Sequence, residues 1–247
     1  MNSSDSAVTK STSNIDNSEN ESSPLLRFFF VGMALFLMLF VLLGFGSTYG
    51  MQLLMDKEIS GSGLVEADWV IHIHAIVFVG WMTLLLTQTI LVARAKTRKH
   101  MAVGKKVGGV LAAAVLMAGS LIIYTQIQAA VSKELVTWAE WRAIVMATLA
   151  PWFALLGFAM LVGLALFYRK QPEEHKRYMI FATILLAVPA TSRMEYLLGP
   201  WSNNIGISIM MAPPIAYDIY TEHRMRNATL VGMGFLAVFL IIINLLG

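Results

Sequence analysis

Cysteine is absent from the 247-residue chain, and charged residues are scarce. Without cysteine there are no disulfide bonds, no thiolate metal sites and no cysteine nucleophile. Charged residues make up 13% of the chain, whereas soluble domains carry about a quarter. There is no HExxH pair, no glycine-rich phosphate loop and no nucleophile elbow, so the corresponding metalloprotease, nucleotide-binding and hydrolase classes are excluded. The last apolar run, residues 228–246, contains no lysine, which excludes a retinal-binding protein.

The chain has long apolar runs instead. Hydrophobic residues make up 57% of it, and its mean hydropathy is +0.67. About 20 residues of helix cross the roughly 30 Å hydrocarbon core of a bilayer, and several nearly uncharged runs reach that length. We therefore predict an all-α integral membrane protein with seven transmembrane helices that span residues 26–48, 69–93, 103–125, 143–168, 178–198, 204–220 and 228–246. Residues 1–24 are rich in serine and asparagine and are predicted to form a disordered tail before the transmembrane domain at 25–247.

The basic residues predict an orientation. Of the 18 lysines and arginines, fourteen belong to the tail and to alternate loops. These are Lys10, Arg27, Arg94, Lys96, Arg98, Lys99, Lys105, Lys106, Arg169, Lys170, Lys176, Arg177, Arg224 and Arg226. The opposite side has Lys57, Lys133, Arg142 and Arg193. By the positive-inside rule the N-terminus is cytoplasmic, and we expect a multi-pass protein of the bacterial inner membrane that does not bind nucleic acid.

Two stretches of the chain are built alike. In residues 90–109 and 165–184 an apolar helix end is followed by an arginine, and a histidine comes six residues after it. The pairs are Arg94 with His100 and Arg169 with His175, and each histidine opens the next helix. Two such helix pairs indicate a pseudo-symmetric four-helix core made of the second to fifth helices. Whether the similarity is a true duplication is left open.

Ionisable groups at membrane helices are costly to bury, so each one suggests a functional role. Depth separates them into two groups. From His74 to His100 is 26 residues, or about 39 Å of helix, which is more than the membrane thickness. His72, His74, Arg193 and Glu195 are predicted at the outer face, and His100, His175, His223 and Asp218 at the cytoplasmic face.

Each of these histidines has two interpretations. His72 and His74 are about 200° apart around a helix, so only one can point into the bundle. They are either interfacial histidines in water or include one buried ligand, for which His74 is the better candidate. The inner histidines, His100, His175 and His223, are either ligands or extend among lipid phosphates beside their basic neighbours. As ligands, two that face each other could hold a haem iron axially, and all three with a carboxylate could hold a metal ion.

Arg193, Glu195 and Asp218 are the remaining candidates. Arg193 and Glu195 are spaced too poorly to pair with each other on one helix, so each is expected to find a partner elsewhere, with His74 a candidate for Glu195. Pro213 and Pro214 predict a kink or break in the sixth helix, one turn before Asp218. A broken helix of this kind can line a binding cavity.

The run His74…Trp81…Gln88…Arg94…His100…Gly104 resembles a family of bacterial polytopic membrane proteins of unknown function. The resemblance continues at His175-Lys176-Arg177-x-Met179 and at Ala216-Tyr217-Asp218 with Thr221 and Arg224, so it covers roughly residues 68–232. More distantly, the pattern is similar to transmembrane b-type cytochromes of the ascorbate-reducible type and to membrane factors for haem-copper oxidase assembly. In those cytochromes, histidines on paired helices hold haem. The resemblance therefore implies haem b as cofactor and His74, His100 and His175 as candidate axial ligands.

Two functions stay open at this point. In the first, the protein binds b-type haem for membrane electron transfer or for haem and oxidase maturation, next to a respiratory-chain membrane protein. In the second, it is a cofactor-free small-molecule transporter or an accessory subunit of a membrane complex. Its polar cavity would then be formed by Gln88, Arg193, Glu195 and Asp218, with His74 nearby. No catalytic residue and no reaction can be named from the sequence.

Overall fold

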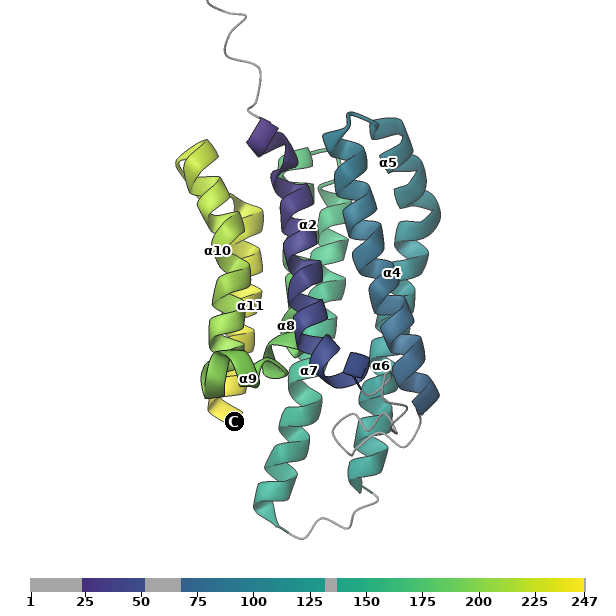
Figure 1. Cartoon of the computed structure of the whole chain (residues 1–247), viewed down its shortest axis with the longest axis vertical. Coiled ribbons are helices and arrows are strands. Elements are labelled where there is room, and N and C mark those ends of the chain that lie inside the picture. The colour runs from purple at the N-terminus through teal and green to yellow at the C-terminus, as the bar shows by residue number, and fades with distance from the viewer. Residues whose placement is uncertain (1–23, 52–67, 132–136, 247) are drawn as a thin grey trace, which may run out of the picture.

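The computed structural model describes residues 24–51, 68–131 and 137–246, and these ranges are helical with short turns and no strand (Figure 1). The predicted disordered tail, residues 1–24, lies outside the described residues except for Pro24. The elements are α2 (Pro24–Phe45), η1 (Gly46–Gly50), α4 (Asp68–Ala93), α5 (Thr97–Val103), η2 (Gly104–Gly108), α6 (Gly109–Val131), α7 (Trp138–Phe167), α8 (Pro172–Ser192), α9 (Glu195–Leu198), η3 (Gly199–Trp201), α10 (Ser202–Glu222) and α11 (Asn227–Leu246).

The seven predicted helices are confirmed as helices, and they correspond in order to α2, α4, α6, α7, α8, α10 and α11. The third begins earlier than predicted, because α5 and η2 continue into α6. Among the residues that the structure describes, five helices are long and apolar enough to cross a membrane, or six if α8 and the bent segment of α9 and α10 count together as one span. The chain therefore has the helices of an integral membrane protein.

Helix α8 is the centre of the bundle. It packs against α2, α7, α10 and α11, and the residues from Ile180 to Leu185 are all buried. A helix enclosed by protein on all sides needs no lipid-facing surface of large apolar side chains. It can therefore carry threonines such as Thr183 and Thr191 in its interior. Alone, α8 is less apolar than the other long helices, because its first turns carry Glu173, Glu174, Lys176 and Arg177.

The bend in this half of the chain lies after α8. The helix ends at Ser192, and the direction changes by 77° before α9 and α10. Gly199, with φ of 68° and ψ of −165°, occupies a conformation open only to glycine. We predicted a kink or break at Pro213–Pro214, and a break does not occur, because α10 runs as one helix from Ser202 to Glu222. Two prolines remove only two backbone donors, and Pro214 is buried against neighbouring helices.

Trp81 joins α4 to the central helix. Its side chain is 2% exposed, its indole nitrogen donates a hydrogen bond to the hydroxyl of Thr183 at 3.1 Å, and its ring packs edge-to-face on Phe158. We expect Trp81→Phe to lower the free energy of unfolding by about 1–3 kcal/mol, since a core contact and a buried hydrogen bond are both lost. Thermal unfolding in detergent measures this, with Trp201→Phe as control, because Trp201 is 64% exposed. Equal melting temperatures for the two variants would contradict it.

Candidate functional site

Two similar helix turns position His100 and His175. Helix α4 ends at Ala93 and α5 begins at Thr97, while α7 ends at Phe167 and α8 begins at Pro172. Each histidine is the fourth residue of its helix, and its backbone nitrogen donates to the carbonyl four residues earlier at 3.0 Å. Proline suits the first position of α8, where no backbone donor is needed. The two stretches that look alike in the sequence thus have corresponding local structures.

The two histidines form a pair, called here the histidine pair. Their ring centres are 6.3 Å apart and the ring planes are inclined at 82°. Both side chains are half-buried between the turns. The Nδ1 atom of His175 lies 2.7 Å from the carbonyl oxygen of Ala165, in the last turn of α7. This bond joins the histidine to the preceding helix and fixes the orientation of its ring.

Gln88 on α4 holds the ring of His100. Its side-chain amide fits its surroundings when the nitrogen faces the histidine. The nitrogen then donates to Nδ1 of His100 at 2.7 Å and to the His100 carbonyl oxygen at 3.2 Å, while the amide oxygen accepts from the backbone nitrogen of Gly104 at 3.0 Å. A Cβ atom at Gly104 would lie only 3.3 Å from the amide atom of Gln88 that faces it, which is the oxygen in this orientation, so glycine makes room for this side chain.

These bonds leave the Nε2 atoms of the histidine pair free. No hydrogen bond to either Nε2 occurs within residues 24–51, 68–131 and 137–246. No buried side-chain nitrogen or oxygen of that part of the chain lacks a partner, so both Nε2 atoms are accessible from outside. The pair therefore has two Nε2 atoms that no other group in the described part of the chain occupies.

A buried ionic cluster lies on the other side of α8 at this same end of the bundle. Arg177 is 1% exposed and Asp218 is 0% exposed, and the Arg177 guanidinium donates to the Asp218 carboxylate at 2.6 Å. The other members of this ionic cluster are Glu173, Glu174, Lys176, Glu222, Arg226 and Thr229. Because His175 and Arg177 are two residues apart, about 200° around α8, they face different neighbours.

Every polar atom of the central pair in this cluster has a partner. Arg177 also bonds to Glu173 at 2.7 Å and to Glu222 at 3.2 Å. The second oxygen of Asp218 accepts from the Thr229 hydroxyl at 2.5 Å and from the backbone nitrogen of Arg226 at 3.0 Å. The hydrogen bond with Glu222 raises the pKa of Arg226. The cluster thereby ties the ends of α8, α10 and α11 together.

The opposite end of the bundle contains His72, His74 and Arg193. The Nδ1 atom of His72 lies 2.7 Å from the Tyr49 hydroxyl, and the ring of His74 stacks on Phe78. Arg193 donates to the carbonyl of Pro189 at 2.7 Å, and its guanidinium lies 4.5 Å from the ring centre of Phe45. The side chains of His72, His74 and Arg193 therefore contact aromatic rings, the Tyr49 hydroxyl and a backbone carbonyl.

The two groups of ionisable residues lie at opposite ends of the bundle. His100, His175 and Asp218 lie at one end of the bundle, and His74 and Arg193 lie at the other. His74 is fourteen residues before Gln88 on α4, or about 21 Å along the helix, so it does not belong to the histidine pair. His223 is exposed in the left-handed turn that ends α10 and does not join the pair either.

The four residues expected to form one polar cavity are in separate places. Gln88 contacts His100, and Asp218 is enclosed in the ionic cluster. Arg193 lies at the opposite end of α8. Glu195 is exposed, and no ion pair joins it to His74 within the described ranges. The reason is the length of α8 and α4, each of which separates its two polar ends by most of a membrane thickness.

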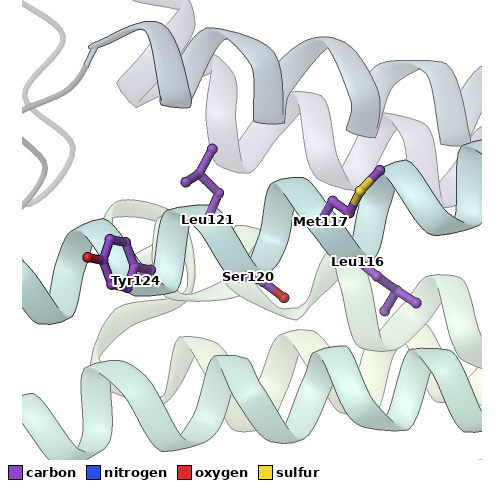
Figure 2. A pocket seen from close by; sticks show the side chains of 5 residues that line it. All are labelled: Leu116, Met117, Ser120, Leu121 and Tyr124. Carbon is purple, nitrogen blue, oxygen red and sulfur yellow. The ribbon is translucent and has the colours of Figure 1, made fainter.

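A shallow groove lies along α6 (Figure 2). It is lined by Leu116, Met117, Ser120, Leu121 and Tyr124, all from one helix. Met117 and Tyr124 are exposed. Since the groove is mostly apolar and lacks a second wall of polar side chains, we assign it to the lipid-facing surface.

Sequence reasoning missed Arg177 as a site residue. It was counted among the basic residues of a loop, yet it is nearly inaccessible. A signal was available, because Glu173 lies one turn before Arg177 on the same helix face and Asp218 lies in an otherwise uncharged stretch of α10. The contacts of Thr183 with Trp81 and of Tyr49 with His72 had no comparable signal.

No protein-family model, no curated protein and no solved structure matches the chain.

Proposed function

We propose that this chain is a multi-pass protein of the bacterial inner membrane that binds one b-type haem through His100 and His175. Its role would be membrane electron transfer or haem handling during oxidase maturation, beside a membrane protein of the respiratory chain. The observation that carries the proposal is the histidine pair with two free Nε2 atoms. Within this proposal His74 is not an axial ligand, since it lies at the opposite end of α4.

The spacing of the pair suits one metal between two imidazoles. With a metal–nitrogen bond of about 2.0–2.1 Å on each side, two such rings have their centres about 6 Å apart. The rings of His100 and His175 are 6.3 Å apart. His175 also donates its other ring nitrogen to a backbone carbonyl, which is the usual arrangement behind a metal-binding histidine.

The number of ligands favours haem over a bare metal ion. Structural zinc sites use four protein ligands and catalytic sites use three. No group of three His, Cys, Asp or Glu side chains suited to a metal occurs in the described part of the chain. Haem iron needs only axial ligands from the protein, and two histidines supply them. When bound, the haem would supply one-electron chemistry, while the chain provides the two axial nitrogens and their hydrogen-bonded supports.

Seven membrane spans with a cytoplasmic N-terminus are part of the proposal. The distribution of basic residues supports this orientation, because fourteen of the 18 lysines and arginines belong to the tail and to alternate loops. The histidine pair lies among these basic loops. The described chain begins and ends at opposite ends of the bundle (Figure 1), as an odd number of spans requires. In this orientation the haem would lie near the cytoplasmic face.

A cofactor-free accessory subunit is the alternative, and one observation favours it. Gln88 donates to Nδ1 of His100 in the orientation that satisfies its surroundings. A neutral His100 then carries its proton on Nε2, which cannot bind a metal in that state.

Histidine variants distinguish the two functions. We expect His100→Ala and His175→Ala each to remove the Soret band of protein purified after expression with haem. His72→Ala and His223→Ala are expected to keep the band, because His72 bonds to Tyr49 and His223 is exposed in a turn. Equal haem content in all four variants would contradict the assignment of the ligands.

A further inference from the structure

The two members of the histidine pair carry their protons on different nitrogens. A carbonyl oxygen only accepts hydrogen bonds, so the contact with Ala165 requires a proton on Nδ1 of His175 and leaves its Nε2 bare. An amide nitrogen only donates, so the contact with Gln88 requires a bare Nδ1 on His100. Neutral His100 therefore has its proton on Nε2. One histidine is ready to bind a metal and the other is not.

The surroundings of Gln88 determine the state of His100. If the amide turned over, its oxygen would take the place 2.7 Å from Nδ1 of His100 and could accept a proton from it. The oxygen would then also lie 3.2 Å from the His100 carbonyl oxygen, and the amide nitrogen would lie 3.0 Å from the backbone nitrogen of Gly104. These are acceptor-to-acceptor and donor-to-donor contacts. Both orientations occupy the same space, but only one satisfies all neighbours.

We propose that Gln88 is a positioning residue that selects which ring nitrogen of His100 is free, so that ligand binding at the histidine pair requires its amide to turn over. With the amide nitrogen toward the ring, His100 presents Nε2–H and closes the site. With the amide oxygen toward the ring, His100 presents a bare Nε2 and the site is complete. The part concerning haem rests on the proposed function, whereas the part concerning the proton does not.

Two substitutions at Gln88 are expected to act in opposite directions. In Gln88→Glu the carboxylate only accepts, so the His100 proton moves to Nδ1 and no amide has to turn. We expect this variant to retain haem better than the wild-type protein. Gln88→Met supports neither ring state, and we expect it to bind haem about 10-fold or more weakly, as when other partners of metal-binding histidines are lost. A merely structural role of Gln88 would weaken binding in both variants.

The proton positions can be measured in the haem-free protein by ¹⁵N NMR of chains labelled at histidine. At about pH 8 most histidines are neutral, and protonated and bare ring nitrogens have well-separated shifts. Signals are assigned from the spectra of His100→Asn and His175→Asn. We expect Nε2–H for His100 and Nδ1–H for His175 in the wild-type protein, and a switch of His100 alone to Nδ1–H in Gln88→Glu.

The outcomes separate the two claims. The same proton position on both histidines of the wild-type protein, or an unchanged His100 in Gln88→Glu, would overturn the role of Gln88 whatever the haem content. The wild-type spectrum tests this even if Gln88→Glu does not fold. The expected switch together with no haem in any variant would support the role of Gln88 and overturn the proposed function. Equal weakening of haem binding in both variants would overturn the coupling between the amide and the ligand.

Discussion

Asp218→Leu is expected to destabilise the protein by about 3–5 kcal/mol, because it leaves Arg177 buried without its main counter-charge. Arg177 is 1% exposed and reaches Asp218 at 2.6 Å. The side chain cannot turn to water, and the Thr229 hydroxyl and the Arg226 backbone nitrogen lose their acceptor as well. Folded yield and melting temperature in detergent measure the loss. Arg224→Met is the matched control, since this basic residue at the same end is exposed.

A double variant tests the physical reason for that loss. Replacing both partners of a buried ion pair by apolar residues is often neutral, whereas removing one partner leaves an uncompensated charge. We therefore expect Asp218→Leu with Arg177→Met to be more stable than Asp218→Leu alone. A double variant whose loss equals the sum of the two single losses would contradict a direct interaction between these side chains.

Gly44→Ala is expected to destabilise the contact between α2 and α8 by about 1–3 kcal/mol. A Cβ atom at Gly44 would lie 2.6 Å from Cβ and 2.8 Å from Cα of Ala190, and it would also meet the Ala190 carbonyl oxygen. These atoms belong to the backbone of the central helix or are fixed to it, so they cannot move aside as a flexible side chain would. The two helices would have to separate.

Gly32 provides the control for this prediction. It lies on the same helix, and a Cβ atom there would meet nothing within 4 Å. Alanine also favours helix over glycine by up to about 1 kcal/mol, so Gly32→Ala is expected to leave the melting temperature unchanged or to raise it. If Gly44→Ala melted at the same temperature as Gly32→Ala, the close packing of α2 against Ala190 would be wrong.

Much of the helix pattern could be predicted from the sequence, because membrane helices follow from the length of apolar runs alone. The start of α4 was predicted within one residue, at Trp69 instead of Asp68. The beginning of α5 was missed, since Thr97, Arg98 and Lys99 are polar and hydropathy cannot tell a polar helix turn from a loop. Of the kink or break expected at Pro213–Pro214, the break does not occur, because α10 continues as one helix through both prolines.

The candidate site was only partly predictable. The repeated spacing of Arg94 with His100 and of Arg169 with His175 marked both histidines, and the structure brings them together. Their contact depends on how α4, α5, α7 and α8 pack together, and a local sequence pattern does not predict this packing. Gln88 was among the residues predicted for the polar cavity, but its contact with His100 and its effect on the His100 proton required atomic positions. Burial of Arg177 followed from the central place of α8, which also could not be known from hydropathy.

The most direct test of the account is the reduced-minus-oxidised visible spectrum of the detergent-purified protein after expression with haem, combined with the ratio of haem to protein. We expect a Soret band and a sharp α-band with one haem per chain, both lost in His175→Ala. A colourless wild-type protein that contains no iron would contradict it.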